Sequence, residues 1–476
     1  MYRWEKIPQS LQEPWPGARR SHAMGRVPWS DELLMFGGFD GGPVLGDAWT
    51  LRLSLRTDAT GASRADWRPA AAALIPVVPR HDHMFECVET KDRRLLALVG
   101  GMAESGNDLS EAGVDRENAC LGETRVLEED IDSSRESQID ATSLWREKGA
   151  LPPRANAAVC RSQKGLICFG GYTGSRCLDD VWLYEPNRET WRQLKPPNSG
   201  YQWPDVRAGH RMVAVSCLDS REERAYAFGG WNGGAKMHGD TWSLDIVAST
   251  NGLTRPWWRK EAVVGSAPDA RACFTMTVLE EKQTSVVCAL YGGLAVDWHA
   301  RCPHLYTVDL PRPSDDPSRP VAFARLRTHG PCRPVAFHSA CRLDGRQSAD
   351  AYEPLLLVFG GGDGAGDLAR NNADVLVLRK VLWHPRNAAC FGAKFRCVAA
   401  SVQRPAFHAR LCAELWTHVL RLCEAAWFGD APPVRLVVAP THLSLSLPGR
   451  AAAAEDEHDD ADSSSSVWET EESDDG

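Results

Sequence analysis

The sequence predicts an all-β fold in which six repeats of four strands form a six-bladed β-propeller. Three observations predict it. An apolar run ending in a glycine pair occurs six times, a Pro-containing loop with an Arg leads into most repeats, and Trp recurs in the later strands. Successive glycine pairs start 59 to 70 residues apart, which is typical of a fixed strand framework with variable loops.

The glycine pairs mark the end of the second strand of each repeat. Each pair follows a run of four to six apolar residues without polar alternation, as in Leu33–Phe36, which predicts a strand buried on both faces. A strand that stops at glycines indicates a sharp turn or a close approach of backbone. The six pairs begin at Gly37, Gly100, Gly170, Gly229, Gly292 and Gly360.

Trp residues mark the third and fourth strands. The third strand begins with Asp and a Trp two residues later at Asp47, Asp180 and Asp240, with a weaker copy at Asp374. The second and fifth repeats depart from this pattern, and the fifth has His304-Leu-Tyr in its place. In the fourth strand a Trp precedes an Arg, at Trp67, Trp145, Trp191 and Trp258.

A Pro-containing loop brings an Arg to the same place before the first strand of five repeats. These residues are Arg19, Arg80, Arg154, Arg207 and Arg271.

These residues resemble the kelch-repeat family, whose blades carry a glycine pair after the second strand and spaced aromatics in the third and fourth. The best copy runs from Phe169 to Trp191, and the resemblance covers about residues 1–380. The resemblance implies a six-bladed propeller. It also implies that the Arg loops and the loops after the glycine pairs share one rim around the central channel.

The last repeat lacks a Trp strand after Leu378, whereas Trp4 stands in an unassigned strand before the first repeat. We therefore expect the N-terminal strand to complete the last blade and remove an open sheet edge. The propeller then spans residues 1–385.

The rest of the chain is predicted to be a C-terminal extension. Residues 386–430 form a helical extension whose apolar positions over 404–427 have helical spacing, 431–453 a linker, and 454–476 a disordered acidic tail. The helix either packs on the propeller or docks an adaptor protein. The tail is either a passive solvated segment or a competitor for the arginines. A polar insertion in the second repeat, including 128–140, is expected to be a surface loop.

Composition limits the function classes. The chain has 476 residues, 43% of them hydrophobic, and a formal net charge of −9. The tail holds eleven acids and no Lys or Arg, so the remainder is nearly neutral and a nucleic-acid binder is not expected. The sequence shows no apolar stretch of membrane-spanning length and no signal peptide. This predicts a cytoplasmic or nuclear protein that does not bind a membrane. The 15 cysteines are expected to be reduced.

The sequence contains none of the common catalytic motifs. The sequence has no nucleophile elbow, phosphate loop, dinucleotide fingerprint or His-Glu-x-x-His, so we expect no enzyme and no cofactor. His299, Cys302 and His304 are a weak metal set, because Zn²⁺ normally takes three or four well-spaced ligands.

The candidate site is therefore a surface. The five loop arginines either capture carboxylates and phosphates or brace the blades. Phe39, Tyr172, Trp231 and Trp298 would add apolar anchors typical of a peptide-binding hot spot. The sequence predicts a non-enzymatic protein–protein interaction scaffold that binds an acidic peptide of a partner on this rim. The alternatives are a substrate-recognition subunit of a ubiquitin ligase and a propeller enzyme with a metal in its channel. The oligomeric state stays open.

Overall fold

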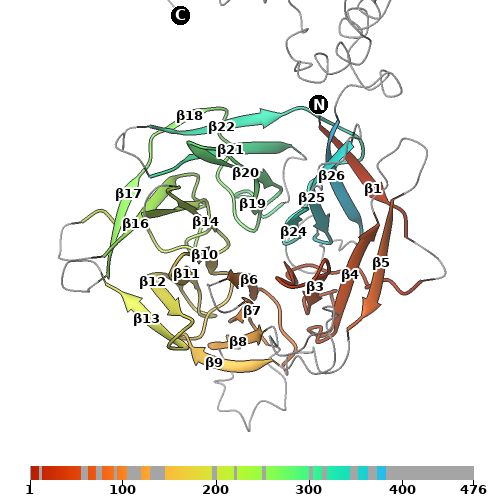
Figure 1. The fold of residues 1–476 in the computed structure, drawn as a ribbon, viewed down its shortest axis with the longest axis horizontal. Helices are drawn as coiled ribbons and strands as arrows, with labels where there is room; N and C mark the ends of the chain where they lie inside the picture. The colour runs from red at the N-terminus through yellow and green to blue at the C-terminus, as the bar shows by residue number, and fades with distance from the viewer. Residues whose placement is uncertain are drawn as a thin grey trace, which may run out of the picture.

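In the computed structural model, the described residues form six β-sheets arranged around a central axis, which confirms the all-β six-bladed propeller (Figure 1). The structure describes residues 2–9, 13–54, 63–70, 78–89, 94–103, 120–128, 145–195, 201–218, 222–248, 254–299, 304–313, 319–343, 352–362 and 373–381.

The first three blades each have four antiparallel strands, given from the axis outward. Blade 1 contains β2 (Ala23–Arg26), β3 (Leu33–Phe36), β4 (Ala48–Ser54) and β5 (Arg64–Pro69). Blade 2 contains β6 (Met84–Glu89), β7 (Arg94–Val99), β8 (Glu123–Glu128) and β9 (Arg146–Ala150). Blade 3 contains β10 (Ala158–Ser162), β11 (Gly165–Tyr172), β12 (Cys177–Glu185) and β13 (Thr190–Leu194).

The other three blades repeat this order, and two of them gain a fifth strand. Blade 4 contains β14 (Arg211–Ser216), β15 (Glu223–Phe228), β16 (Thr241–Ala248) and β17 (Thr254–Lys260). Blade 5 contains β19 (Thr275–Glu281), β20 (Ser285–Tyr291), β21 (Leu305–Pro311), β22 (Val321–Leu326) and β18 (Val263–Gly265). Blade 6 contains β24 (Ser339–Arg342), β25 (Tyr352–Phe359), β26 (Val375–Val381), β1 (Tyr2–Ile7) and β23 (Thr328–His329).

The N-terminal strand closes the ring, as the sequence predicts. β1 pairs antiparallel with β26, and the register places Trp4 opposite Leu378 (Figure 1). Trp4 is fully buried in a cluster with Leu356 and Tyr291, so it joins blade 6 to blade 5. The first and last parts of the described chain therefore share one sheet.

Two short outer strands were not predicted. β18 follows the outer strand of blade 4 and pairs in parallel with β22 of blade 5, and β23 follows β22 and pairs in parallel with β1. Each runs into a glycine with positive φ, Gly265 or Gly330, whose backbone lies against the neighbouring strand. These strands cover the outer edges of blades 5 and 6.

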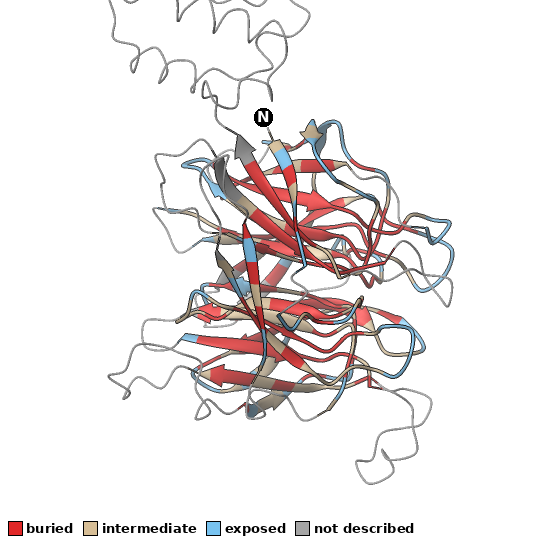
Figure 2. Ribbon diagram, turned by 90° about the vertical axis from the view of Figure 1, so that its right-hand side faces the viewer, coloured by how far each residue is buried: buried red, intermediate tan, exposed pale blue. Residues whose placement is uncertain are grey.

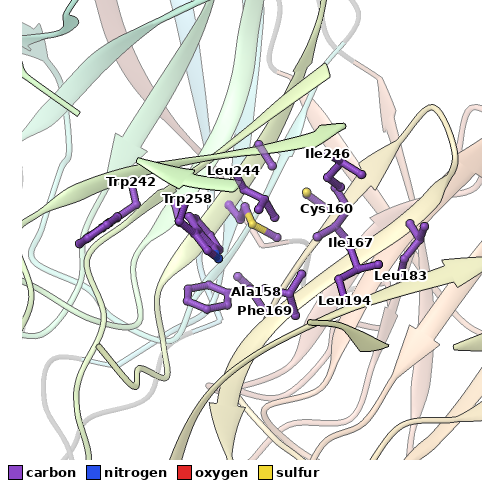
Figure 3. Packing of buried hydrophobic residues seen from close by; sticks show 14 residues of the cluster. Ala158, Cys160, Ile167, Phe169, Leu183, Leu194, Trp242, Leu244, Ile246 and Trp258 are labelled. Atoms are coloured by element: carbon purple, nitrogen blue, oxygen red, sulfur yellow. The ribbon is translucent and has the colours of Figure 1, made fainter. Parts of the chain in front are cut away.

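The core lies between neighbouring blades, where the apolar strands that end in glycine pairs are buried (Figure 2). Figure 3 shows one such contact, in which residues of blade 3 face residues of blade 4. The ring centroids of Phe169 and Trp258 are 4.6 Å apart across this interface. Trp258 therefore fills space between these two blades.

Some predicted segments fall outside the described residues. They are the end of the predicted propeller domain beyond Val381, the helical extension, the linker, the acidic tail, and most of the insertion in the second repeat.

Candidate interaction rim

Two sets of loops meet at one end of the ring, which we call the rim. One set carries the predicted arginines, and the other follows the glycine pairs. In the five blades that carry the Arg, isolated backbone bridges join the residue after the Arg to the residue after the glycine pair, for example Ala155 to Tyr172 and Ala208 to Trp231. The rim is thus built from the loops that the resemblance indicated.

The five arginines are buried within the rim, with 0–3% of each residue exposed. Arg154 shows the common arrangement. Its Nε donates to the Pro152 carbonyl at 3.0 Å and its Nη1 to the Gly170 carbonyl at 3.0 Å. Its two Nη atoms donate to the two Asp180 carboxylate oxygens at 2.7 and 2.9 Å. Blades 1, 2 and 4 repeat the ion pair with Arg19 and Asp47, Arg80 and Glu123, and Arg207 and Asp240.

In blades 1, 3 and 4 the carboxylate receives a further hydrogen bond from the Trp two residues later. In blade 3, Trp182 Nε1 donates to Asp180 Oδ2 at 2.7 Å. Burial alone would raise the pKa of Asp180, but the hydrogen bonds from Arg154 and Trp182 outweigh it and lower the pKa. The acid is therefore held in its charged form.

The arginine backbone also joins neighbouring blades. The carbonyl of Arg207 in blade 4 accepts a hydrogen bond from the Gly171 N–H of blade 3 at 2.9 Å. Gly170 has φ +62°, and a Cβ on it would lie 2.6 Å from the Arg207 carbonyl oxygen. The glycine pair is thus required by backbone conformation and by the close approach of the next blade.

These contacts support the bracing role of the arginines. Their guanidinium groups lie under the rim surface, already paired in four blades with an acid of the same blade. Ligand capture by these side chains stays a prediction, and in those blades it would require a ligand to displace the blade's own carboxylate.

Blade 5 differs because His304 stands where the other blades have an acid. The Arg271 guanidinium lies 5.6 Å from the centroid of the Tyr306 ring, and Arg325 contacts the His304 ring. Burial, Arg325 and Arg271 lower the pKa of His304, so its imidazole is neutral and accepts the Arg325 hydrogen bond. This part of the rim carries basic groups at a position where other blades carry a carboxylate.

Three of the four predicted aromatic residues form a continuous row, which we call the aromatic stripe: Tyr172 of blade 3, Trp231 of blade 4 and Trp298 of blade 5. Ring centroids are 5.8 Å apart between Tyr172 and Trp231 and 5.1 Å apart between Trp231 and Trp298. Trp298 is 37% exposed and has φ +60°. Phe39 lies on blade 1 against Arg20 and His81 instead.

The loops fix two of the three rings of the stripe, Tyr172 and Trp231. The Tyr172 hydroxyl donates to the Gly174 carbonyl, and Trp231 Nε1 donates to the Gly234 carbonyl. The Cys177 thiol of blade 3 contacts the Trp231 carbonyl of blade 4 at 3.4 Å. Because the polar atoms are already bonded within the loops, the ring faces are suited to apolar contact.

Next to the axis, the rim narrows to a closed ring of backbone hydrogen bonds, which we call the inner ring. One residue per blade donates its N–H to the carbonyl of the equivalent residue in the preceding blade at 2.7–3.0 Å. All six have positive φ. They are Ser21, Asp82, Asn156, Gly209, Cys273 and Phe337.

The predicted metal set is only partly described. Cys302 lies outside the described residues, while His304 contacts Arg325. Within the described ranges, no group of three His, Cys, Asp or Glu side chains is placed to hold a metal ion. The same part of the chain contains no helix with the length and hydropathy of a membrane span.

Known proteins are similar to this chain in sequence. A family model described as the KLHDC2/KLHL20/DRC7 Kelch-repeats domain matches residues 1–217 and 113–312. An F-box/kelch-repeat protein of Arabidopsis thaliana is 33% identical over 115 residues, which are 23% of this chain and 22% of that protein. A leucine-zipper-like transcriptional regulator 1 homolog of Drosophila melanogaster is 22% identical over 245 residues, 51% of this chain and 21% of that protein. The matches thus span about a fifth of each relative.

Proposed function

Because this chain belongs to the kelch-repeat family, whose propellers typically bind other proteins, we propose that it is a non-enzymatic interaction module that binds a partner on its rim. The partner's contact would centre on the aromatic stripe of Tyr172, Trp231 and Trp298. The observation that carries this proposal is the direct contact of these three rings across three successive blades.

The stripe has the properties of a binding hot spot. Its rings are large, and those of Tyr172 and Trp231 are held by hydrogen bonds within their own loops, so binding would order few additional side chains. Trp298 is partly exposed, and Val296 in the same loop is 60% exposed, which leaves apolar surface beside the stripe. An extended segment of a partner crossing blades 3 to 5 would cover both.

Charge supports an acidic group at the blade 5 end of that segment. Blade 5 has His304 at the position where the other blades have an acid, and the exposed Arg325 lies against the His304 ring. An Asp or Glu of the partner would meet the Arg325 guanidinium there, with charge-assisted hydrogen bonds. The acidic character is the finer part of the proposal and rests on this one blade.

The experiment compares tagged full chains by quantitative affinity purification and mass spectrometry. Trp298→Ala, alone and with Trp231→Ala, is expected to reduce the recovery of specific partners. If the stripe is a hot spot, the affinity for a purified partner should fall by about 30-fold or more. Trp257→Ala is the matched control, because Trp257 is a 46% exposed Trp on β17, the outer strand of blade 4.

Equal recovery with Trp298→Ala and Trp257→Ala would contradict the proposal. The proposed preference for an acidic partner has its own test. Arg325→Gln should weaken partner binding and make that binding less dependent on salt concentration. If the Trp variants weaken binding while Arg325→Gln does not, the stripe stands and the acidic preference fails.

A second function is favoured by one relative. The Arabidopsis thaliana protein is named as an F-box/kelch-repeat protein, so a role as the substrate-recognition subunit of a ubiquitin ligase is the alternative. Ligase subunits copurifying with the full chain, in amounts unaffected by the Trp298→Ala substitution, would support that role. Their absence would leave the simpler interaction module.

A further inference from the structure

The central channel forms a cavity of about 830 Å³ on the side of the inner ring away from the rim. The inner strands run from the rim loops down the axis. The cavity is lined by their far halves, as far as Ser216 at the end of β14, and by Gln163 in the turn after β10. A separate small space of about 30 Å³ at the rim end is bounded by inner-ring residues. The larger cavity therefore opens toward the face opposite the rim.

The inner ring provides a common level from which positions in each blade are counted. Three residues beyond it, five blades place an apolar side chain against the cavity: Met24, Phe85, Met212, Met276 and Ala340. This depth of the channel is an apolar zone. Volumes of this size and lining are typical of small-molecule sites.

Five residues beyond the inner ring, three blades place an arginine against the same cavity. These are Arg26, Arg161 and Arg342, and all three also line its wall. Arg26 has 42% of its side chain exposed, and Arg161 and Arg342 are exposed. We call the level of these three arginines the basic mouth. It lies two residues beyond the apolar zone, which is about 7 Å along an extended strand.

The carboxylates that line the cavity offset the positive charge of its arginines only in part, because Arg26, Arg161, Arg312 and Arg342 outnumber Glu86, Glu223 and Glu281 in its wall. Glu223 accepts hydrogen bonds from Ser162 Oγ at 2.6 Å and Gln163 N at 3.0 Å, and Glu281 pairs with Arg312 at 3.3 Å. Glu86 lies between the two levels, and burial raises its pKa to about 7 although Arg161 opposes this. Near neutral pH this carboxyl is therefore partly protonated.

We propose that the channel binds an amphipathic anion, with an acyl chain in the apolar zone and a carboxylate or phosphate head at the guanidinium groups of Arg26, Arg161 and Arg342. The arginines also have contacts within the protein. A guanidinium has five N–H donors, so an exposed one can bond an anionic head in addition. Alkyl burial and head-group pairing are both needed, which excludes short anions and uncharged chains as good ligands.

The probe for the test is dodecanoate, titrated into the full chain by isothermal titration calorimetry. We expect saturable binding with one site per chain, at least about tenfold weaker binding of dodecanol, and no binding of acetate. Shortening to octanoate removes four CH2 groups, each worth about fourfold in affinity when buried. Dodecyl phosphate distinguishes the head groups, because the tighter of the two anions identifies the head that the mouth prefers.

Two kinds of variant make the test specific. The double variant Arg161→Gln with Arg342→Gln should lower the affinity for dodecanoate at least about tenfold and leave the affinity for dodecanol unchanged. Ala214→Phe should fill the channel and lower the affinity for both dodecanoate and dodecanol. Arg188→Gln is the matched control, because Arg188 has 73% of its side chain exposed and pairs with Glu185 away from the cavity.

The proposal is overturned if dodecanol binds as tightly as dodecanoate, if the double arginine variant binds like the control, or if binding does not saturate. The charge variants change exposed side chains, so they remain informative even if Ala214→Phe does not fold. Because the cavity lies away from the rim, this result is independent of partner binding at the aromatic stripe.

Discussion

Replacing Arg154 by Met tests whether the loop arginines brace the blades. The substitution removes the ion pair with Asp180 and the hydrogen bonds to the Gly170 and Pro152 carbonyls, while keeping much of the side-chain volume. Removing one partner of a buried ion pair costs about 3–5 kcal/mol. Asp180 has 21% of its side chain exposed, so water partly replaces the lost partner and the expected loss is about 3 kcal/mol.

The assay is urea unfolding followed by tryptophan fluorescence, with melting temperature as a second measure. Asp180→Asn should cost less, about 1–2 kcal/mol, because the amide oxygen still accepts a hydrogen bond. The double variant should show a coupling energy of about 1–3 kcal/mol, since the two residues contact each other. Arg188→Met, at an exposed position of the same blade, should stay within about 0.5 kcal/mol of the unsubstituted protein.

A loss below about 1 kcal/mol for Arg154→Met would refute the bracing argument. If that variant also lost partner binding, the result would favour the alternative prediction, in which the arginines capture carboxylates or phosphates of a ligand.

Two other predictions concern ring closure and acid stability. Deleting residues 1–8 removes β1 and the buried Trp4 and exposes the edge of β26, so it should lower the melting temperature far more than deleting 454–476; equal melting temperatures would contradict the closure. Burial lowers the pKa of His22, His83, His210 and His338, the last to about 3, so the unfolded chain takes up protons first below about pH 6.5 and stability should fall as pH drops from there. His83→Phe copies the Phe274 that stands at this position in blade 5, and it should reduce the pH dependence measured by denaturation at pH 5 and 7; an unchanged dependence would mean that other groups cause it.

The strand framework was predictable because each blade buries both faces of its second strand. That burial leaves an unbroken apolar run, and the close approach of the next blade requires the glycines after it. The place of Trp4 could also be predicted. The last repeat lacked a Trp strand and the strand around Trp4 had no repeat of its own, so the two had to belong to one blade. The later strands of blades 2 and 5 form although they lack the Asp and Trp pattern, since β8 and β21 still pair along their backbones.

The partner of each loop arginine was not predicted, although the sequence contains a signal for it. Asp47, Asp180 and Asp240 were assigned as heads of strands, and an Arg precedes each of them in its own repeat. An Arg and an acid that recur together indicate an ion pair, and this reasoning would have placed the guanidinium groups inside the rim. β18 and β23 carried no such signal, because two or three paired residues are too few for a pattern.

The aromatic stripe could be listed from sequence but not assembled. Each ring follows or lies near a glycine pair, but contact among Tyr172, Trp231 and Trp298 depends on blade curvature and loop conformation. Phe39 has the same position in its repeat as Tyr172 and Trp231, yet it lies against Arg20 and His81 on blade 1. Sequence position fixes the rim but not the neighbours of each ring on it.

Site-specific photo-crosslinking tests the central claim most directly. A photoreactive aromatic amino acid, which keeps a ring at the position, replaces Trp298 in the full chain, and the same amino acid replaces the comparably exposed Trp257 in a control chain. The interaction-rim account predicts partner crosslinks at position 298, with few at position 257. Partner crosslinks at position 257 with none at position 298 would contradict it and move the binding surface to the outer edge of blade 4.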